Sequence, residues 1–275
     1  MDHYVTSGRE SVSIEEFQHR SRKVASGLAE VGVTEGDSVA LLLRNDIAFL
    51  EASFGASLLG AYPVPVNWHF KQTEIQYILD NCKAKVLVAH SDLIPKLPIP
   101  LPKHIQIIIV PTPPEIQQSY NLTPEQCAPT KGQTVWDHWR DQFTPWNKPP
   151  AAERGSMIYT SGTTGLPKGV RRAPASPNLQ QAMMERLQIG FGIRAGAKAI
   201  MTGPLYHSAP NAYARAIIAL EGDLILMPRF DASEFLTQVK KHSITHAHMV
   251  PTMFVRLLDL SETRRRNAHL ESLES

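Results

Sequence analysis

The stretch Tyr159-Thr-Ser-Gly-Thr-Thr-Gly-Leu-Pro-Lys-Gly-Val170 is the most informative part of this 275-residue sequence. It follows a short β-type run, Ser156–Thr160, and precedes a segment that Ser176 and Pro177 can open as a helix. Its three glycines allow tight turns and a close approach of the backbone to a ligand. Four hydroxyl groups and the ammonium group of Lys168 can direct donors at an anion. The sequence therefore predicts a phosphate-binding loop.

The spacing of this loop differs from that of the common mononucleotide P-loop. That motif, G-x-x-x-x-G-K-[ST], places glycine directly before lysine and a hydroxyl residue after it. Here Pro167 precedes Lys168 and Gly169 follows it, so the P-loop is excluded. The alternative is an ordinary surface loop rich in glycine and threonine. A lysine held between proline and glycine in a twelve-residue run favours phosphate binding over that alternative.

Composition and charge are those of an ordinary globular protein, with 43% apolar and 20% charged residues. The formal net charge of +2 gives no indication of nucleic-acid binding. Cys82 and Cys127 lack metal-ligand spacing and fit a reducing compartment. The most apolar long window, Ile47–Val66, contains a glutamate, two glycines and two prolines, so no transmembrane segment is predicted. Because the start, Met1-Asp-His-Tyr4, is not a signal peptide, we expect a cytoplasmic protein.

Short apolar runs alternate with segments of helical periodicity along most of the chain, which predicts an α/β fold with largely parallel sheets. The expected strands are Ser38–Leu43, Lys85–Ala89, Ile105–Val110, Lys198–Thr202, Asp223–Met227 and Ser243–Val250. Asn45 is expected to cap the second helix, and Asp231 with Glu234 forms a predicted capping box. Prolines interrupt Pro111–Pro150, where only Thr134–Phe143 is predicted to be helical.

Tyr159–Val170 closely resembles the signature of the adenylate-forming (AMP-binding) superfamily, which includes acyl-CoA synthetases, luciferases and peptide-synthetase adenylation domains. The resemblance covers nearly the whole chain, through the segments Glu35–Asn45, Gly60–Asn67, Pro204–Asn211 and Met249–Phe254. Lys168–Pro174 and the pair Tyr206-His207 are more similar to the acyl- and aryl-CoA ligase branch than to amino-acid-activating domains.

The resemblance implies two stacked α/β subdomains, residues 1–40 with 195–275 in one and residues 41–194 in the other. In the family, motifs for adenine, ribose and magnesium follow, and then a mobile C-terminal domain that supplies a lysine. We therefore expect this chain to be the first half of the N-terminal domain, truncated after Ser275 and inactive alone. The strand ending at Val250 is then expected to be an exposed sheet edge prone to self-association.

By resemblance, the chain activates a fatty or aryl carboxylic acid with ATP and Mg²⁺ and transfers the acyl group to coenzyme A. The predicted catalytic residues are Lys168 and His207, and the predicted substrate pocket contains Tyr206, His207 and His248. The predicted magnesium ligand is Thr163. The ATP phosphates are expected at Thr160, Ser161, Gly162, Thr163, Thr164, Gly165 and Lys168.

Several alternatives stay open at this stage. Thr163 is equally compatible with a turn hydroxyl, and His207 with a polar residue before a helix. His246 and His248 share one face of a strand, a pairing seen in metal sites, but no third ligand is evident. Tyr213 fits a core position. The alternative function is a non-catalytic remnant that binds nucleotide or a partner protein.

Overall fold

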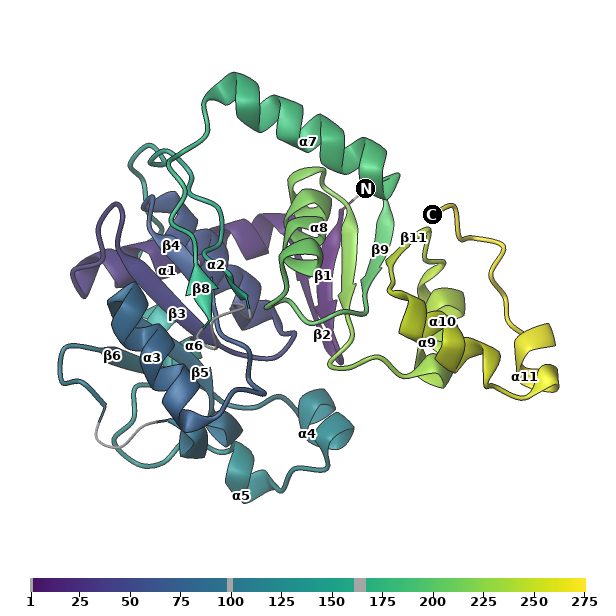
Figure 1. The fold of residues 1–275 in the computed structure, drawn as a ribbon, viewed down its shortest axis with the longest axis horizontal. Helices are drawn as coiled ribbons and strands as arrows, with labels where there is room; N and C mark the ends of the chain where they lie inside the picture. The colour runs from purple at the N-terminus through teal and green to yellow at the C-terminus, as the bar shows by residue number, and fades with distance from the viewer. Residues whose placement is uncertain (1, 98–100, 161–166) are drawn as a thin grey trace. The chain divides into compact units, whose positions relative to one another are not determined.

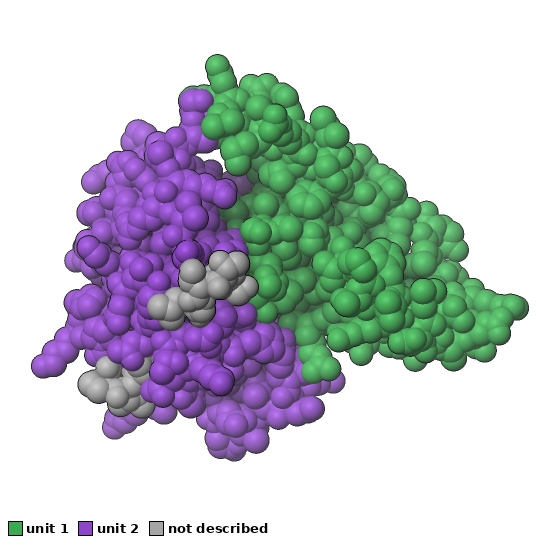
Figure 2. Space-filling view, viewed as in Figure 1, with its two compact units in different colours: residues 1–14, 177–275 green, residues 15–176 purple. Residues whose placement is uncertain are grey.

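The structure is a computed structural model that describes residues 2–97, 101–160 and 167–275 (Figure 1). The chain divides into two compact units, and Figure 2 shows them in different colours. Unit 1 comprises residues 1–14 and 177–275, and unit 2 comprises residues 15–176. No helix among the described residues is both long and apolar enough to cross a membrane.

Unit 2 contains a four-stranded parallel sheet in the order β4-β3-β5-β6. Every residue of β3 is buried, as expected for a strand covered on both faces. The elements of this unit are α1 (Ile14–Glu30), β3 (Ser38–Leu42), α2 (Ile47–Leu58), β4 (Tyr62–Pro65), α3 (Gln72–Cys82), β5 (Ala84–His90), the 3-10 helix η1 (Ser91–Lys96), β6 (Gln106–Val110), α4 (Pro114–Tyr120), α5 (Pro124–Cys127), α6 (Trp136–Asp141), β7 (Tyr159–Thr160) and β8 (Lys168–Gly169). The α/β prediction with largely parallel sheets is confirmed for this unit.

Helix α1 lies almost entirely in unit 2, where it packs on α2. The rings of Phe17 and Phe54 meet edge to face with centroids 5.2 Å apart. A Cβ atom at Gly55 would lie 2.6 Å from Val24 Cγ1, so the glycine permits close contact of the two helices. The whole of α7 (Pro177–Phe191) belongs to unit 1.

The proline-rich segment contains more helix than the sequence predicts. Besides α6 it forms α4 and α5, so the prediction of a single helix there is wrong. Pro114 and Pro124 are the first residues of these helices, where the missing N–H has no helical partner to lose. Asp46, and not Asn45, caps α2: its Oδ1 accepts the Ile47 N–H at 2.6 Å.

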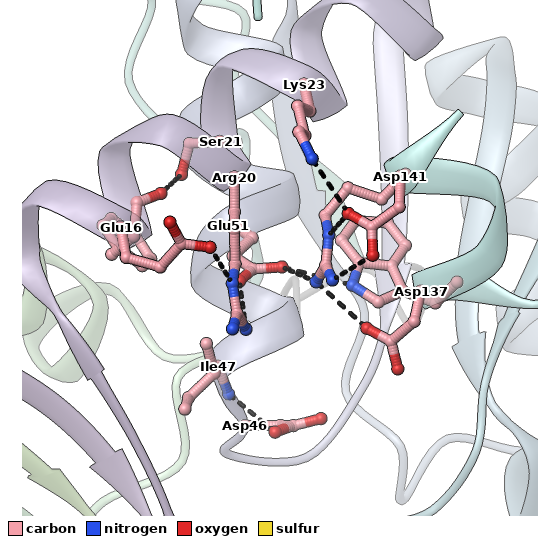
Figure 3. Close-up of polar contacts among 12 residues, drawn as sticks. Glu16, Arg20, Ser21, Lys23, Asp46, Ile47, Glu51, Asp137 and Asp141 are labelled. Atoms are coloured by element: carbon pink, nitrogen blue, oxygen red, sulfur yellow. Dashed lines mark hydrogen bonds and ion pairs between the residues drawn. The ribbon is translucent and has the colours of Figure 1, made fainter. Parts of the chain in front are cut away.

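A buried ion cluster joins α1, α2 and α6 of unit 2 (Figure 3). Glu51 on α2 is 1% exposed, and its Oε2 accepts bonds from Arg140 Nη1 at 3.1 Å and Trp136 Nε1 at 3.2 Å. Arg20 Nη1 lies 3.7 Å from its other carboxylate oxygen. Burial raises the pKa of Glu51 to about 7, although both arginines oppose the rise. The helical layer of unit 2 is thus held by a carboxyl group that titrates near neutral pH.

Unit 1 contains a five-stranded sheet in the order β11-β9-β10-β1-β2, parallel except for the β1–β2 hairpin. The helix α9 covers part of one face, where Phe235 and Val239 pack on Ile200 and Ile225. Asp231 caps α9 by accepting the Glu234 N–H at 2.8 Å, which is one of the two hydrogen bonds of the predicted capping box. The elements are β1 (Tyr4–Ser7), β2 (Glu10–Ser13), α7, β9 (Lys198–Met201), α8 (Ser208–Ala219), β10 (Asp223–Leu226), α9 (Ala232–His242), β11 (His246–His248), α10 (Pro251–Leu258) and α11 (Glu262–Arg266).

The edge strand β11 is not left open along its length. Ala247 N–H donates to the Ser275 carbonyl at 2.9 Å, and the Thr245 carbonyl accepts the Glu274 N–H at 2.8 Å. The expectation of an uncovered edge is therefore wrong at these residues, because the last residues of the chain pair with β11.

Candidate functional site

Two of the predicted phosphate-binding residues, Thr160 and Lys168, lie on a small hairpin in unit 2. Its strands β7 and β8 pair antiparallel, with Thr160 opposite Lys168 and Tyr159 opposite Gly169. The side chains of Thr160 and Lys168 are exposed and project from the same face of the hairpin. A hydroxyl donor and an ammonium group are thereby held together at one point, which suits an anion. Ser161, Gly162, Thr163, Thr164 and Gly165 lie outside the described residues, and so does the predicted magnesium ligand.

Gly169 is required by the packing of this hairpin. A Cβ atom at this position would lie 2.6 Å from Tyr159 Cε2 and 2.7 Å from Met157 Cε. Tyr159 is buried, and its hydroxyl donates to Asn81 Oδ1 on α3 at 2.5 Å. Burial raises the pKa of the Tyr159 hydroxyl, so the group stays a neutral donor. The tyrosine ring therefore fills the space that a side chain at position 169 would need.

Arg171 fastens the hairpin to the amino ends of the parallel strands in unit 2. Its guanidinium donates to the Gly36 carbonyl at 3.0 Å, the Cys82 carbonyl at 2.6 Å and Ser38 Oγ at 3.3 Å. It also stacks over the ring of Tyr62, 5.4 Å from the centroid. These contacts fix the chain directly after Lys168.

Two further contacts extend this anchor. Tyr62 donates its hydroxyl to the Arg172 carbonyl at 2.8 Å, and Met157 N–H donates to the Pro63 carbonyl at 2.8 Å. Sequence reasoning assigned no role to Arg171 or Tyr62. The available signal was the position of Arg171, directly after the loop motif in Lys168-Gly-Val-Arg171.

The predicted acid-binding residues Tyr206 and His207 lie in unit 1, where β9 leads into α8. Their rings are adjacent, with centroids 4.5 Å apart. Tyr206 is buried, whereas His207 is exposed and occupies the N-cap position of α8 with extended backbone angles. Burial of part of its ring lowers the pKa of His207, so the imidazole is neutral at neutral pH. A neutral ring can donate one hydrogen bond and accept another.

His248 lies next to this segment in the sheet. It is the last residue of β11 and pairs with Met201, the last residue of β9. Ligands of parallel α/β sheets bind at the carboxyl ends of the strands, where both segments lie. The structure thus places Tyr206, His207 and His248 at one edge of the unit 1 sheet, while Thr160 and Lys168 belong to unit 2.

The ring of His248 is surrounded by aromatic groups. Its centroid lies 5.5 Å from that of Phe191 and 5.6 Å from that of Tyr213. Burial lowers the pKa of His248. His248 Nδ1 and the Tyr213 hydroxyl are buried without a hydrogen-bond partner among the described residues. Sequence reasoning treated Tyr213 as core, and only the fold brings its ring to His248.

His246 does not act with His248 as a metal pair. Its Nε2 lies 2.9 Å from the Gly192 carbonyl, which can only accept, so Nε2 carries the proton. Its Nδ1 then accepts from the Thr245 hydroxyl at 2.7 Å. Among the described residues no group of three or more His, Cys, Asp or Glu side chains is arranged to hold a metal ion.

Comparison with known proteins gives the family. Residues 2–275 match the AMP-binding enzyme family. The sequence is 26% identical to 4-coumarate–CoA ligase 3 of Arabidopsis thaliana, over 86% of this chain and 40% of that ligase. It is 29% identical to 4-hydroxybutyrate–CoA ligase 2 of Metallosphaera sedula, over 86% of this chain and 42% of that ligase. The chain thus spans less than half the length of these two relatives.

Solved structures share the fold. A benzoate CoA ligase from Burkholderia xenovorans superposes with a TM-score of 0.78 at 19% identity, over 97% of this chain and 50% of that one. An anthranilate CoA ligase in complex with anthranoyl-AMP gives a TM-score of 0.76 at 21% identity, over 98% of this chain and 50% of that one. The match of residues 2–275 is supported by these relatives and this fold, and the chain belongs to the AMP-binding enzyme family.

Proposed function

We propose that the chain acts as an AMP-forming acyl-CoA synthetase, which activates a fatty or aryl carboxylic acid with ATP and transfers the acyl group to coenzyme A. The observation that carries this proposal is the β7–β8 hairpin, which holds Thr160 opposite Lys168 in a chain that matches the AMP-binding enzyme family. The ligase relatives are named for acids joined to coenzyme A, which supports the same reaction class here. We place the reaction in the cytoplasm, in line with two free cysteines.

The proposed reaction has two steps. A carboxylate oxygen of the acid attacks the α-phosphorus of ATP, and pyrophosphate leaves to give an acyl-adenylate. The thiol of coenzyme A then attacks the acyl carbon, loses its proton and displaces AMP. Charge develops on phosphate oxygens in the first step, so the protein contributes mainly by fixed positive charge and orientation.

In this proposal Lys168 and Thr160 bind phosphate oxygens of ATP. The ammonium of Lys168 offsets their negative charge, and Arg171 positions the hairpin through its carbonyl contacts. The carboxylic acid enters near Tyr206 and His207, and the neutral imidazole of His207 donates a hydrogen bond to it. His248 lines the acyl end. Magnesium would be held by the ATP phosphates with Thr163, and when bound it would neutralise phosphate charge.

Nucleotide binding without turnover is the alternative. The observation that favours it is that Thr160 and Lys168 both lie on one local hairpin of unit 2. The hairpin is local in sequence, so it can bind phosphate groups without the remaining parts of a ligase. Both proposals require ATP to bind, and only the first requires the acid to react.

An exchange experiment separates the two. The purified chain is incubated with ATP, Mg²⁺ and labelled pyrophosphate, with a panel of aryl and fatty acids, while ATP binding is measured by calorimetry. Acid-dependent return of label into ATP supports acyl-adenylate formation by this chain. Saturable ATP binding without exchange supports nucleotide binding alone. The absence of both ATP binding and exchange contradicts both proposals.

A further inference from the structure

A basic cavity lies in unit 1, and none of the residues assigned above lines it. Its volume is about 630 Å³, and it is lined by the β1–β2 hairpin, the first residues of β9 and β10, and the carboxyl end of α9. This size falls in the range of small-molecule sites, roughly 300–1,000 Å³. The lining contains Arg9, Lys198, Lys241 and His242, with Asp223 as its one carboxylate.

The positive charges of this cavity are not balanced by the protein. No carboxylate among the described residues forms an ion pair with Arg9, Lys198 or Lys241. Asp223 is already engaged, because its Oδ1 accepts the Tyr4 N–H at 2.8 Å. Three cations from three separate segments of unit 1 therefore line one cavity whose single carboxylate is already hydrogen-bonded.

His242 lies close enough to Lys198, Lys241 and Asp223 for each of these charges to shift the pKa of its imidazole. Burial lowers its pKa most, and Lys241 and Lys198 lower it further, whereas Asp223 opposes them. Its Nε2 is buried without a hydrogen-bond partner among the described residues. An unpaired imidazole nitrogen beside two cations is a ready donor for an anion that enters the cavity.

The helix dipole explains only part of this arrangement. Lys240, Lys241 and His242 occupy the last turn of α9, where positive charge is favourable. Arg9 follows β1 and Lys198 begins β9, so the dipole of α9 gives no reason for either. The hydroxyls of Thr6 and Ser11 lie on the same lining, 2.9 Å from each other, and add further donors.

We propose that this cavity binds a phosphate-bearing small molecule, held by Arg9, Lys198, Lys241 and His242. Phosphate groups offer several acceptor oxygens and more than one negative charge, which match the separated cations and hydroxyl donors. The volume accommodates more than a single phosphate ion. This site is independent of the phosphate-binding loop, since every lining residue belongs to unit 1.

The test uses inorganic pyrophosphate as the probe and the full chain carrying Lys168→Ala, which removes the cation of the loop. We expect saturable one-to-one binding in calorimetry at low salt, weaker as ionic strength rises. Arg9→Ala and Lys241→Ala should each weaken this binding roughly three- to tenfold. The matched control is Lys240→Ala, because Lys240 is an exposed neighbour on α9 that lines a different cavity.

Each outcome decides the proposal. The proposal is overturned if no saturable binding is seen up to about 10 mM pyrophosphate. This limit corresponds to a binding free energy of roughly 3 kcal/mol. Equal affinity in the Lys241→Ala and Lys240→Ala variants also overturns it. If one variant fails to fold by circular dichroism, Lys198→Ala replaces it, since that side chain is exposed as well. If Lys168→Ala abolishes ATP binding but the chain still binds pyrophosphate, the result supports both the phosphate-binding loop and this separate cavity.

Discussion

Substitution of Gly169 by alanine should damage the hairpin that carries Lys168. The new Cβ atom would lie 2.6 Å from Tyr159 Cε2, and ordinary contact begins at 3.4 Å, so one group must move by about 0.8 Å. The Tyr159 ring resists this movement, because its hydroxyl is bonded to Asn81 and the ring is buried. Overpacking of this kind costs about 1–3 kcal/mol, and loss of the hydrogen bond about 0.5–1.5 kcal/mol more.

We therefore expect Gly169→Ala to lower the free energy of unfolding of unit 2 by about 1.5–4.5 kcal/mol. Urea unfolding followed by tryptophan fluorescence reports this unit, because all four tryptophans lie in residues 15–176. The matched control is Gly155→Ala, since a Cβ atom at Gly155 would meet no atom within 4 Å. A difference between the two variants smaller than about 0.5 kcal/mol would refute the packing argument.

A double-mutant cycle identifies the partner. If the Tyr159 ring is the obstacle, Gly169→Ala should cost at least about 1 kcal/mol less in a Tyr159→Ala background than in the wild-type chain. Equal costs in the two backgrounds would assign the effect to another group. The same series should show weaker ATP binding in Gly169→Ala than in Gly155→Ala, because the clash displaces the strand that holds Lys168.

Three further predictions concern other residues. Burial raises the pKa of Glu51 to about 7 from 4.5, so its contribution to stability is fully present below pH 4.5 and is lost as pH rises through 7. Urea titrations at several pH values should show a loss of up to about 3 kcal/mol in unit 2, and Glu51→Gln should flatten this slope. Arg171→Ala should lower the unfolding free energy by about 1–3 kcal/mol in the same assay, and Arg172→Ala should have little effect. In an active enzyme, His207→Ala should raise the KM for the acid roughly tenfold and leave that for ATP unchanged, which pyrophosphate-exchange kinetics would measure.

Local sequence patterns predicted the regular part of the fold. The apolar runs around Val39 and Leu87 became largely buried strands of a parallel sheet, since runs of this length bounded by turn residues favour strands. The N-cap position of Asp231 was also a local signal, and this half of the predicted capping box was confirmed. The short helices α4 and α5 were not predicted, because proline was interpreted only as a residue that interrupts helices. Proline is also common at the first position of a helix.

The contacts that position the β7–β8 hairpin could not be predicted from local sequence patterns. Arg171 reaches Gly36, 135 positions earlier, and Tyr62 reaches the Arg172 carbonyl across 110 positions. The residues next to Arg171 and Tyr62 in the sequence do not indicate these partners. The partners are set by the sheet, which brings distant strand ends together. The cluster of Tyr213 with His248 has the same origin, as α8 and β11 become neighbours only in the folded unit.

We expect Lys168, the first residue of β8, to bind the phosphates of ATP. Calorimetric titration of ATP into the wild-type chain, Lys168→Ala and the control Lys103→Ala tests it most directly, because Lys103 is another exposed lysine of unit 2. A charge-assisted hydrogen bond contributes about 1.5–3 kcal/mol, so Lys168→Ala should weaken ATP binding roughly ten- to hundredfold. Lys103→Ala should bind as the wild type does. Equal affinity in all three proteins would contradict the account.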